Sequence, residues 1–332
     1  MDLEGRAYAR RLRNSLIGLV ALIVAVAGLL LALPGLDDVE RLLAHADPGW
    51  VLGVVGFEYL SCVGYVLTVM LAFPRGRVRP TARLAWAELA ANSVLPAGGL
   101  GGLGLGAWIL RRRGVPAARI ARRSTVVFFL TSAVNVVVLV IVGLGLGLGL
   151  IPGPRGPGLT LLPAAIGIAA ILLTLGGARA ADRIATSSER ERLAAALESL
   201  ARGIGDTVEE LRRHDWRLIG AVAYFGFDVA ALGASFAATS HTPTIAAIVM
   251  AHLIGQMAGI IPIPGGIGAV DGGLVGSLVL YGVPFGDATA AVLLYRAISL
   301  SLPAVLGTIA FLLLRRHLDD PLVLRSPPSR AG

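Results

Sequence analysis

The sequence predicts an all-α integral membrane protein, and three observations support this fold class. First, 55% of the 332 residues are hydrophobic and only 15% are charged, with a mean hydropathy of +0.77. A soluble domain of this length does not cover so much apolar surface. Second, several apolar runs reach the roughly 20 residues that a helix needs to cross a bilayer. Third, proline and glycine interrupt two apolar stretches, near residues 96–99 and 262–266. We expect about six spanning helices and two broken helical hairpins.

The first half of the chain contains two spans, one hairpin and a third, longer span. In order, these are Asn14–Leu33, Trp50–Phe73, the arms Leu84–Leu95 and Gly98–Leu110, and Ser124–Ile151. An acidic loop separates the first two spans, and an arginine-rich linker precedes the hairpin. Residues 50–151 form the predicted repeat unit one.

The second half begins with an additional span at residues 159–177 and a charged, helix-favouring stretch at 181–215. Apolar residues recur in this stretch at spacings of three and four, as in an amphipathic helix on a membrane surface. Repeat unit two covers 216–315, with spans at 216–239 and 287–314 and hairpin arms at 244–261 and 268–280. Residues 318–332 are expected to be a disordered tail, and 1–332 to form a single domain.

Charge distribution predicts the orientation, because cytoplasmic loops collect basic residues. All 29 basic residues are arginines. Both termini are placed in the cytoplasm, and each hairpin enters and leaves on one side. Cytoplasmic segments then hold 26 arginines, external segments hold two, and Arg296 lies within a span. We therefore expect a multi-pass protein of the cell membrane. The first apolar run has the length of a full span, so a cleaved signal peptide is not expected.

An internal repeat relates the two hairpins. An offset of 168 residues places Pro96 on Pro264, and the triplet that starts at Gly114 on the one that starts at Gly282. The additional span at 159–177 inverts the second copy, so the hairpins enter from opposite sides. Broken helices at corresponding positions of inverted repeats indicate a substrate site near the midplane. The arms of 12–18 residues measure about 18–27 Å as helices, so they are re-entrant or nearly spanning.

Asp271 is the leading candidate for a site residue. A carboxylate just after a proline-glycine break in apolar sequence would carry a large free-energy cost if it faced lipid. We therefore expect it to face a cavity or a cation. Its expected partner is Arg296. Two interpretations remain open, a charged cavity for a polar head group or for proton coupling, and a structural ion pair between hairpin and helix.

Other polar residues in apolar segments extend the candidate cavity. These are Asp228, Glu88, Asn92 and Gln256. Glu88 corresponds to Gln256 in the repeat, and Asn92 shares a helix face with Glu88. Glu58 is placed nearer to an interface. His252 is a candidate for titration in a cavity, but no metal-ligand spacing is present.

The break motifs and their flanks complete the candidate list. The helix-breaking residues are Pro96, Gly98, Gly99, Pro262, Pro264, Gly265 and Gly266. Arg111, Arg112 and Arg113 are a possible surface for an anionic lipid head group, with ordinary cytoplasmic anchoring as the favoured alternative. The formal GxGxxG at 99–104 follows no strand, so it does not indicate a dinucleotide site. Glycines at 143–149, and Gly272 with Gly276, predict close helix packing.

A family resemblance is carried by residues 255–307, GQMAGIIPIPGGIGAVDGGLVGSLVLYGVPFGDATAAVLLYRAISLSLPAVLG. This run resembles the lysylphosphatidylglycerol synthase transmembrane-region family, also called flippase-like, which includes the membrane part of the multiple peptide resistance factor. NSVLPAGGLGGLGLGAWILRRRGVP resembles the first hairpin of that family. Two departures stand out. The family usually has Glu where Asp271 stands, and its first hairpin often reads Pro-x-Arg-x-Gly-Glu, whereas this chain has Pro96-Ala-Gly-Gly-Leu-Gly.

The resemblance implies a protein that moves a polar-head-group lipid between leaflets, such as an aminoacyl-phosphatidylglycerol or a glycolipid. Two alternatives are kept: a membrane enzyme or accessory protein of polyprenyl-phosphate or glycolipid synthesis, and a proton-coupled carrier of a small anion. No catalytic motif, cofactor site or metal site is expected, and neither is an enzymatic activity. Expected partners are membrane lipids, a second copy of the chain and a separate synthase, and no nucleic acid.

Overall fold

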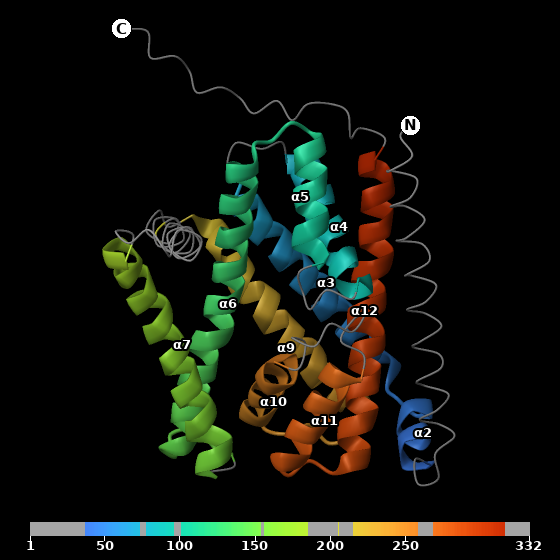
Figure 1. Ribbon diagram of the computed structural model, residues 1–332. Coiled ribbons are helices and arrows are strands. Elements are labelled where there is room, and N and C mark those ends of the chain that lie inside the picture. Colours follow the sequence, from blue (N-terminus) through green and yellow to red (C-terminus); the bar gives the residue numbers. More distant parts are fainter. Residues whose placement is uncertain are drawn as a thin grey trace, which may run out of the picture.

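The computed structural model describes residues 37–73, 78–95, 101–153, 156–184, 205, 215–257 and 268–315. In this part of the chain the regular structure is helical throughout (Figure 1), which confirms the predicted fold class. The helices are α2 (Asp37–Ala44), α3 (Pro48–Leu71), α4 (Val78–Val94), α5 (Gly101–Arg112), α6 (Ala117–Gly147), α7 (Pro157–Ile184), η2 (Trp216–Leu218), α9 (Ile219–Thr239), α10 (Ile245–Met257), α11 (Ala269–Leu280) and α12 (Phe285–Arg315).

Five of the described helical segments are long and apolar enough to span a membrane. They are Pro48–Leu71, Ala117–Gly147, Pro157–Thr174, Trp216–Thr239 and Phe285–Arg315. The sixth predicted span, Asn14–Leu33, lies outside the described residues. So do the predicted tail and nearly all of the predicted surface helix at 181–215, of which residues 181–184 continue α7.

Two boundaries differ from the sequence prediction. Helix α6 begins at Ala117 rather than at Ser124, directly after Pro116, whose extended backbone caps the helix. The extra turns place Arg123 inside a membrane helix, so Arg296 is not the only arginine within a span. The acidic loop also contains a helix, α2, because Val39, Leu42 and Leu43 share one face that packs against α12.

Helices α3 and α9 form the centre of the bundle and run antiparallel. Ser61 Oγ donates a hydrogen bond to the Tyr224 carbonyl at 2.8 Å. The backbones approach closely at two glycines, since a Cβ on Gly64 would lie 2.5 Å from the Tyr224 nitrogen and one on Gly220 would lie 2.7 Å from the Gly64 oxygen. Small residues of this kind let membrane helices pack without a gap.

The two hairpins occupy opposite halves of the bundle. In Figure 1, α4 and α5 lie in the upper half, whereas α10 and α11 lie in the lower half. Helices α5, α10 and α11 have 12, 13 and 12 residues. They therefore measure about 18–20 Å, less than the roughly 30 Å hydrocarbon core. None of these three helices is long enough to cross the core by itself.

The same turn closes both hairpins. After α5, Gly114 has a φ of 75° and the Val115 N–H donates to the Leu110 carbonyl at 3.0 Å. After α11, Gly282 has a φ of 88° and the Val283 N–H donates to the Leu278 carbonyl at 3.0 Å. The glycines adopt the left-handed conformation that ends many helices. The repeat in sequence is thus accompanied by a repeat in backbone geometry, at opposite ends of the bundle (Figure 1).

The glycine-rich segments differ in how closely neighbouring helices approach them. A Cβ on Gly143 would lie 2.8 Å from the Thr160 carbonyl, so the 143–149 run does allow α6 and α7 to pack closely. In contrast, a Cβ on Gly272 or Gly276 would meet no described atom within 4 Å. The prediction of close packing is therefore wrong for Gly272 and Gly276 within the described part of the chain.

Candidate functional site

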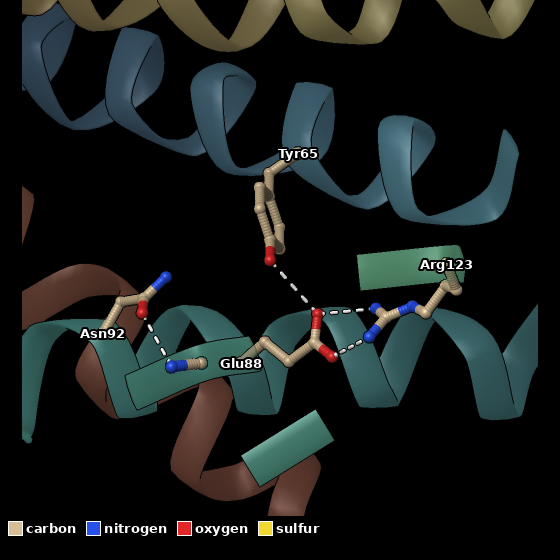
Figure 2. Close-up of polar contacts among 5 residues, drawn as sticks. Tyr65, Glu88, Asn92 and Arg123 are labelled. Carbon is tan, nitrogen blue, oxygen red and sulfur yellow. Dashed lines mark hydrogen bonds and ion pairs between the residues drawn. The ribbon is translucent and has the colours of Figure 1, made fainter. Parts of the chain in front are cut away.

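The first polar centre is a sealed ion pair between the first hairpin and α6 (Figure 2). Arg123 Nη1 and Nη2 donate to Glu88 Oε1 and Oε2 at 2.6 and 2.7 Å. The side chains are 1% and 0% exposed. Tyr65 Oη donates to Glu88 Oε2 at 3.1 Å, so three helices supply one fully buried network. The Arg123 guanidinium also lies 5.3 Å from the centre of the Phe73 ring.

Helix α5 is shaped around this ion pair. A Cβ on Gly106 would overlap Glu88 Oε1, so only glycine leaves room for the carboxylate. Asn92 Oδ1 accepts a hydrogen bond of 2.7 Å from the Gly102 N–H (Figure 2), near the start of α5. These contacts tie α4 to α5 and leave the Glu88 carboxylate no face open to a ligand. The arrangement is suited to holding the first hairpin rigid.

The second polar centre is the pair between Asp271 and Arg296, at the start of α11. Arg296 Nε donates to Asp271 Oδ1 at 2.6 Å, as the sequence led us to expect. Asp271 Oδ2 accepts the Gly268 N–H at 2.8 Å, which caps the first turn of α11. The side chains are 22% and 12% exposed for Asp271 and Arg296. This pair therefore remains accessible, immediately after the predicted helix break.

The third polar centre surrounds Asp228 on α9, in the core of the bundle. Tyr295 Oη donates to Asp228 Oδ1 at 2.6 Å, and His252 Nε2 lies 3.3 Å from Asp228 Oδ2. Glu58 on α3 is 5% exposed, and its Oε1 accepts a hydrogen bond from the Cys62 thiol at 3.7 Å. The sequence placed Glu58 nearer to an interface, whereas the structure buries it. In the described part of the chain no group of acidic, His and Cys side chains is arranged to hold a metal ion.

The remaining candidates fall into three groups. Gln256 is half-buried near the end of α10. The three consecutive arginines do not share one surface, because Arg111 is exposed, Arg112 lies 5.9 Å from the Trp108 ring, and Arg113 is 8% exposed. The helix-breaking residues Pro96, Gly98, Gly99, Pro262, Pro264, Gly265 and Gly266 lie outside the described residues. The predicted cavity between the hairpins depends on these segments.

Sequence reasoning missed several participants. Arg123 was counted among the cytoplasmic arginines, although its position next to an apolar run was the available signal. Tyr65 and Tyr295 are single tyrosines in apolar helices, and nothing in their spacing marks them as partners of carboxylates. His252 was considered for titration, but its contact with Asp228 depends on how α9 and α10 pack.

Taken together, the fold and its polar centres define a multi-pass membrane protein with two short-armed hairpins, each tied to the bundle by a carboxylate–arginine pair. Residues 16–307 match the family model described as "Lysylphosphatidylglycerol synthase TM region". The chain belongs to this family, and the resemblance is confirmed. A curated relative is the UPF0104 membrane protein MJ1595 of Methanocaldococcus jannaschii, which is 30% identical over 112 residues. The match covers 32% of this chain and 33% of that protein.

Proposed function

We propose that the protein is a lipid transporter that moves a polar-head-group phospholipid or glycolipid between leaflets, with Asp271 and Arg296 contacting the head group. The observation that carries this proposal is the partly exposed ion pair at the start of α11, in a chain of this family. Ionisable residues within a membrane carry a high free-energy cost and usually mark a substrate or ion pathway.

The chemistry of the pair matches an aminoacylated phospholipid head group. Such a head group carries a phosphate and a free amine. The Arg296 guanidinium can donate paired hydrogen bonds to phosphate oxygens, and the Asp271 carboxylate can accept from an ammonium group. Because the two side chains pair with each other, a lipid with both charges can replace their contact without leaving either charge unpaired.

The second hairpin is a better place for the head group than the first. The Glu88–Arg123 pair is at most 1% exposed and is completed by Tyr65, so a ligand would have to break the core to reach it. The Asp271–Arg296 pair is 22% and 12% exposed, and Asp271 lies in the first turn of α11. The first hairpin then serves as a support.

We further propose that the protein resides in the cell membrane with both termini in the cytoplasm. The arginine distribution supports this orientation: even without Arg123, which lies within α6, 25 of the 29 arginines fall on one side. A separate synthase would supply an aminoacylated lipid, and transport rather than catalysis would be the role of this chain.

A leaflet-transfer assay tests the proposal. The full chain is reconstituted in vesicles that contain fluorescently labelled phosphatidylglycerol or lysylphosphatidylglycerol, and a membrane-impermeant quencher reports which leaflet holds the label. We expect the wild type to accelerate transfer. Asp271→Asn and Arg296→Gln should slow transfer roughly tenfold or more, because loss of one partner of a hydrogen-bonded charge pair commonly costs over 1.4 kcal/mol.

Matched controls separate the pair from general charge effects. Glu40→Gln and Arg119→Gln remove one carboxylate and one arginine from exposed positions of the described helices, so transfer should be unchanged. The proposal is wrong if the wild type transfers neither labelled lipid faster than protein-free vesicles. The site assignment is wrong if Asp271→Asn and Arg296→Gln transfer lipid as fast as the two controls.

A further inference from the structure

The Asp228 centre contains two buried polar atoms that have no hydrogen-bond partner among the described residues. They are Glu58 Oε2 and His252 Nδ1. Glu58 is 5% and His252 is 2% exposed. Buried polar groups are nearly always satisfied in folded proteins, so two orphans beside one carboxylate call for a physical explanation.

The packing of α3 on α9 places Glu58 beside Asp228. The two helices are antiparallel, and Phe57 stacks on Phe227 with ring centres 6.2 Å apart. In an antiparallel pair the next residues, Glu58 and Asp228, move from that level in opposite directions by one residue rise each, about 3 Å in all, so they remain within one helix turn of each other. The charge of Asp228 acts electrostatically on Glu58. Two carboxylates that share a water-poor site cannot readily both be ionised.

The other groups around Glu58 do not supply a counter-charge at contact. Cys62 and Tyr224 are uncharged neighbours on α3 and α9, and Tyr295 on α12 donates its hydroxyl to Asp228. Arg296 is within electrostatic range, but its Nε lies 2.6 Å from Asp271. On α4 and α6, the charged groups of the network in Figure 2 are paired with each other. Among the described residues none forms an ion pair with Glu58.

His252 contacts Asp228 rather than Glu58. Its Nε2 lies 3.3 Å from Asp228 Oδ2, and its Nδ1 has no hydrogen-bond partner among the described residues. An imidazole in contact with a buried carboxylate is the side chain best suited to exchange a proton with it.

We propose that Glu58, Asp228 and His252 form a buried proton-binding site in which Glu58 carries an exchangeable proton as a neutral carboxylic acid. A buried, unpaired carboxylate would cost several kcal/mol, whereas a neutral acid avoids that penalty. Chains of acidic and His side chains of this kind form proton relays in membrane pumps and transporters. The site is distinct from the Asp271–Arg296 pair and does not depend on lipid transport.

Infrared difference spectroscopy of the full chain in lipid nanodiscs tests the site with the proton itself as the probe. The C=O stretch of a protonated carboxylic acid should be present at neutral pH, should shift in D₂O and should be lost in Glu58→Gln. Asp228→Asn should shift the frequency of the band, because it changes the field at Glu58. The exposed-carboxylate control Glu40→Gln should leave the band unchanged.

Thermal unfolding provides a second measurement that does not rely on the spectrum. Glutamine has the shape and charge of a protonated glutamate, so Glu58→Gln should retain the melting temperature of the wild type. Glu88→Gln, which removes a paired charge, should lower the melting temperature clearly. The proposal is overturned if no acid band is present at neutral pH, if the band survives Glu58→Gln, or if Glu58→Gln destabilises the protein as much as Glu88→Gln.

Discussion

The two hairpins each carry a carboxylate–arginine pair, but the surroundings of the two pairs are opposite. Glu88 and Arg123 are 0% and 1% exposed, whereas Asp271 and Arg296 are 22% and 12% exposed. Both pairs join a hairpin to the spanning helix that follows it. The same kind of ion pair is therefore a closed clamp in the first hairpin and a partly exposed contact in the second.

The difference also explains how the first hairpin keeps its place without the charged motif common in its family. The family often has Arg and Glu within the break itself, and this chain has small residues there. Here Glu88 in α4 and Arg123 in α6 supply the charges from the flanking helices, and Tyr65 completes the network. Charge was therefore not lost from this half of the protein, because Glu88 and Arg123 form a buried pair there.

Removing one partner of the closed pair should have the largest effect. Glu88→Gln leaves the Arg123 charge buried and uncompensated, so the unfolding free energy should fall by about 3–5 kcal/mol. Denaturation in mixed micelles, or the yield of monodisperse protein, measures the loss. The double variant Glu88→Gln/Arg123→Gln should recover part of the stability, because no unpaired charge remains. A double variant that is less stable than Glu88→Gln would contradict this account.

Glycine substitutions compare the two hairpins at the level of packing. Gly106→Ala inserts a methyl group where Glu88 Oε1 lies, so we expect a loss of about 1–3 kcal/mol from overpacking. Gly104→Ala, two residues earlier in α5, meets no described atom within 4 Å and is the matched control. Gly276→Ala in α11 should be neutral or stabilise by about 0.5–1 kcal/mol, because alanine favours a helix. Equal effects of Gly106→Ala and Gly104→Ala on the unfolding free energy would argue against close packing of Gly106 on the Glu88 carboxylate.

The sequence was sufficient to predict the elements of this fold because apolar length and proline-glycine breaks are local signals. The described spans lie within a few residues of the predicted ones, and Trp216–Thr239 has the predicted bounds. The departure at α6 has a physical reason. Arg123 looked like an interfacial arginine, and only a partner distant in sequence, Glu88, allows it inside the helix.

Pairing within the candidate sites was harder to predict from sequence. Asp271 and Arg296 lie on consecutive helices and were each alone in apolar sequence, so their contact could be anticipated. The Asp228 centre draws on four helices, and its contacts depend on the antiparallel register of α3 and α9. The sequence alone does not give that register, so it does not predict that Glu58 and His252 lie near Asp228.

A smaller effect is expected at the joint between the arms of the first hairpin. Asn92→Ala removes the acceptor of the Gly102 N–H, a hydrogen bond of 2.7 Å. Because Asn92 is only half-buried and water can replace part of the contact, the expected loss is about 1 kcal/mol. Asn92→Asp retains the acceptor and should be closer to the wild type in unfolding free energy. If Asn92→Ala costs as much as Glu88→Gln, the first hairpin depends on this joint rather than on the ion pair.

The smallest change in stability is expected at the accessible pair, where the effect on function should be largest. Asp271→Asn retains an oxygen that can accept the Gly268 N–H, so the cap of α11 survives. The lost charge interaction is partly exposed to solvent, and we expect a change of only about 0.5–1 kcal/mol in unfolding free energy. Unfolding and lipid transfer should therefore be measured on the same preparations of Asp271→Asn and Glu88→Gln, which separates an effect on stability from an effect on transport. A large loss of stability in Asp271→Asn would make the second hairpin a clamp like the first, and would remove the physical reason for placing a head group there.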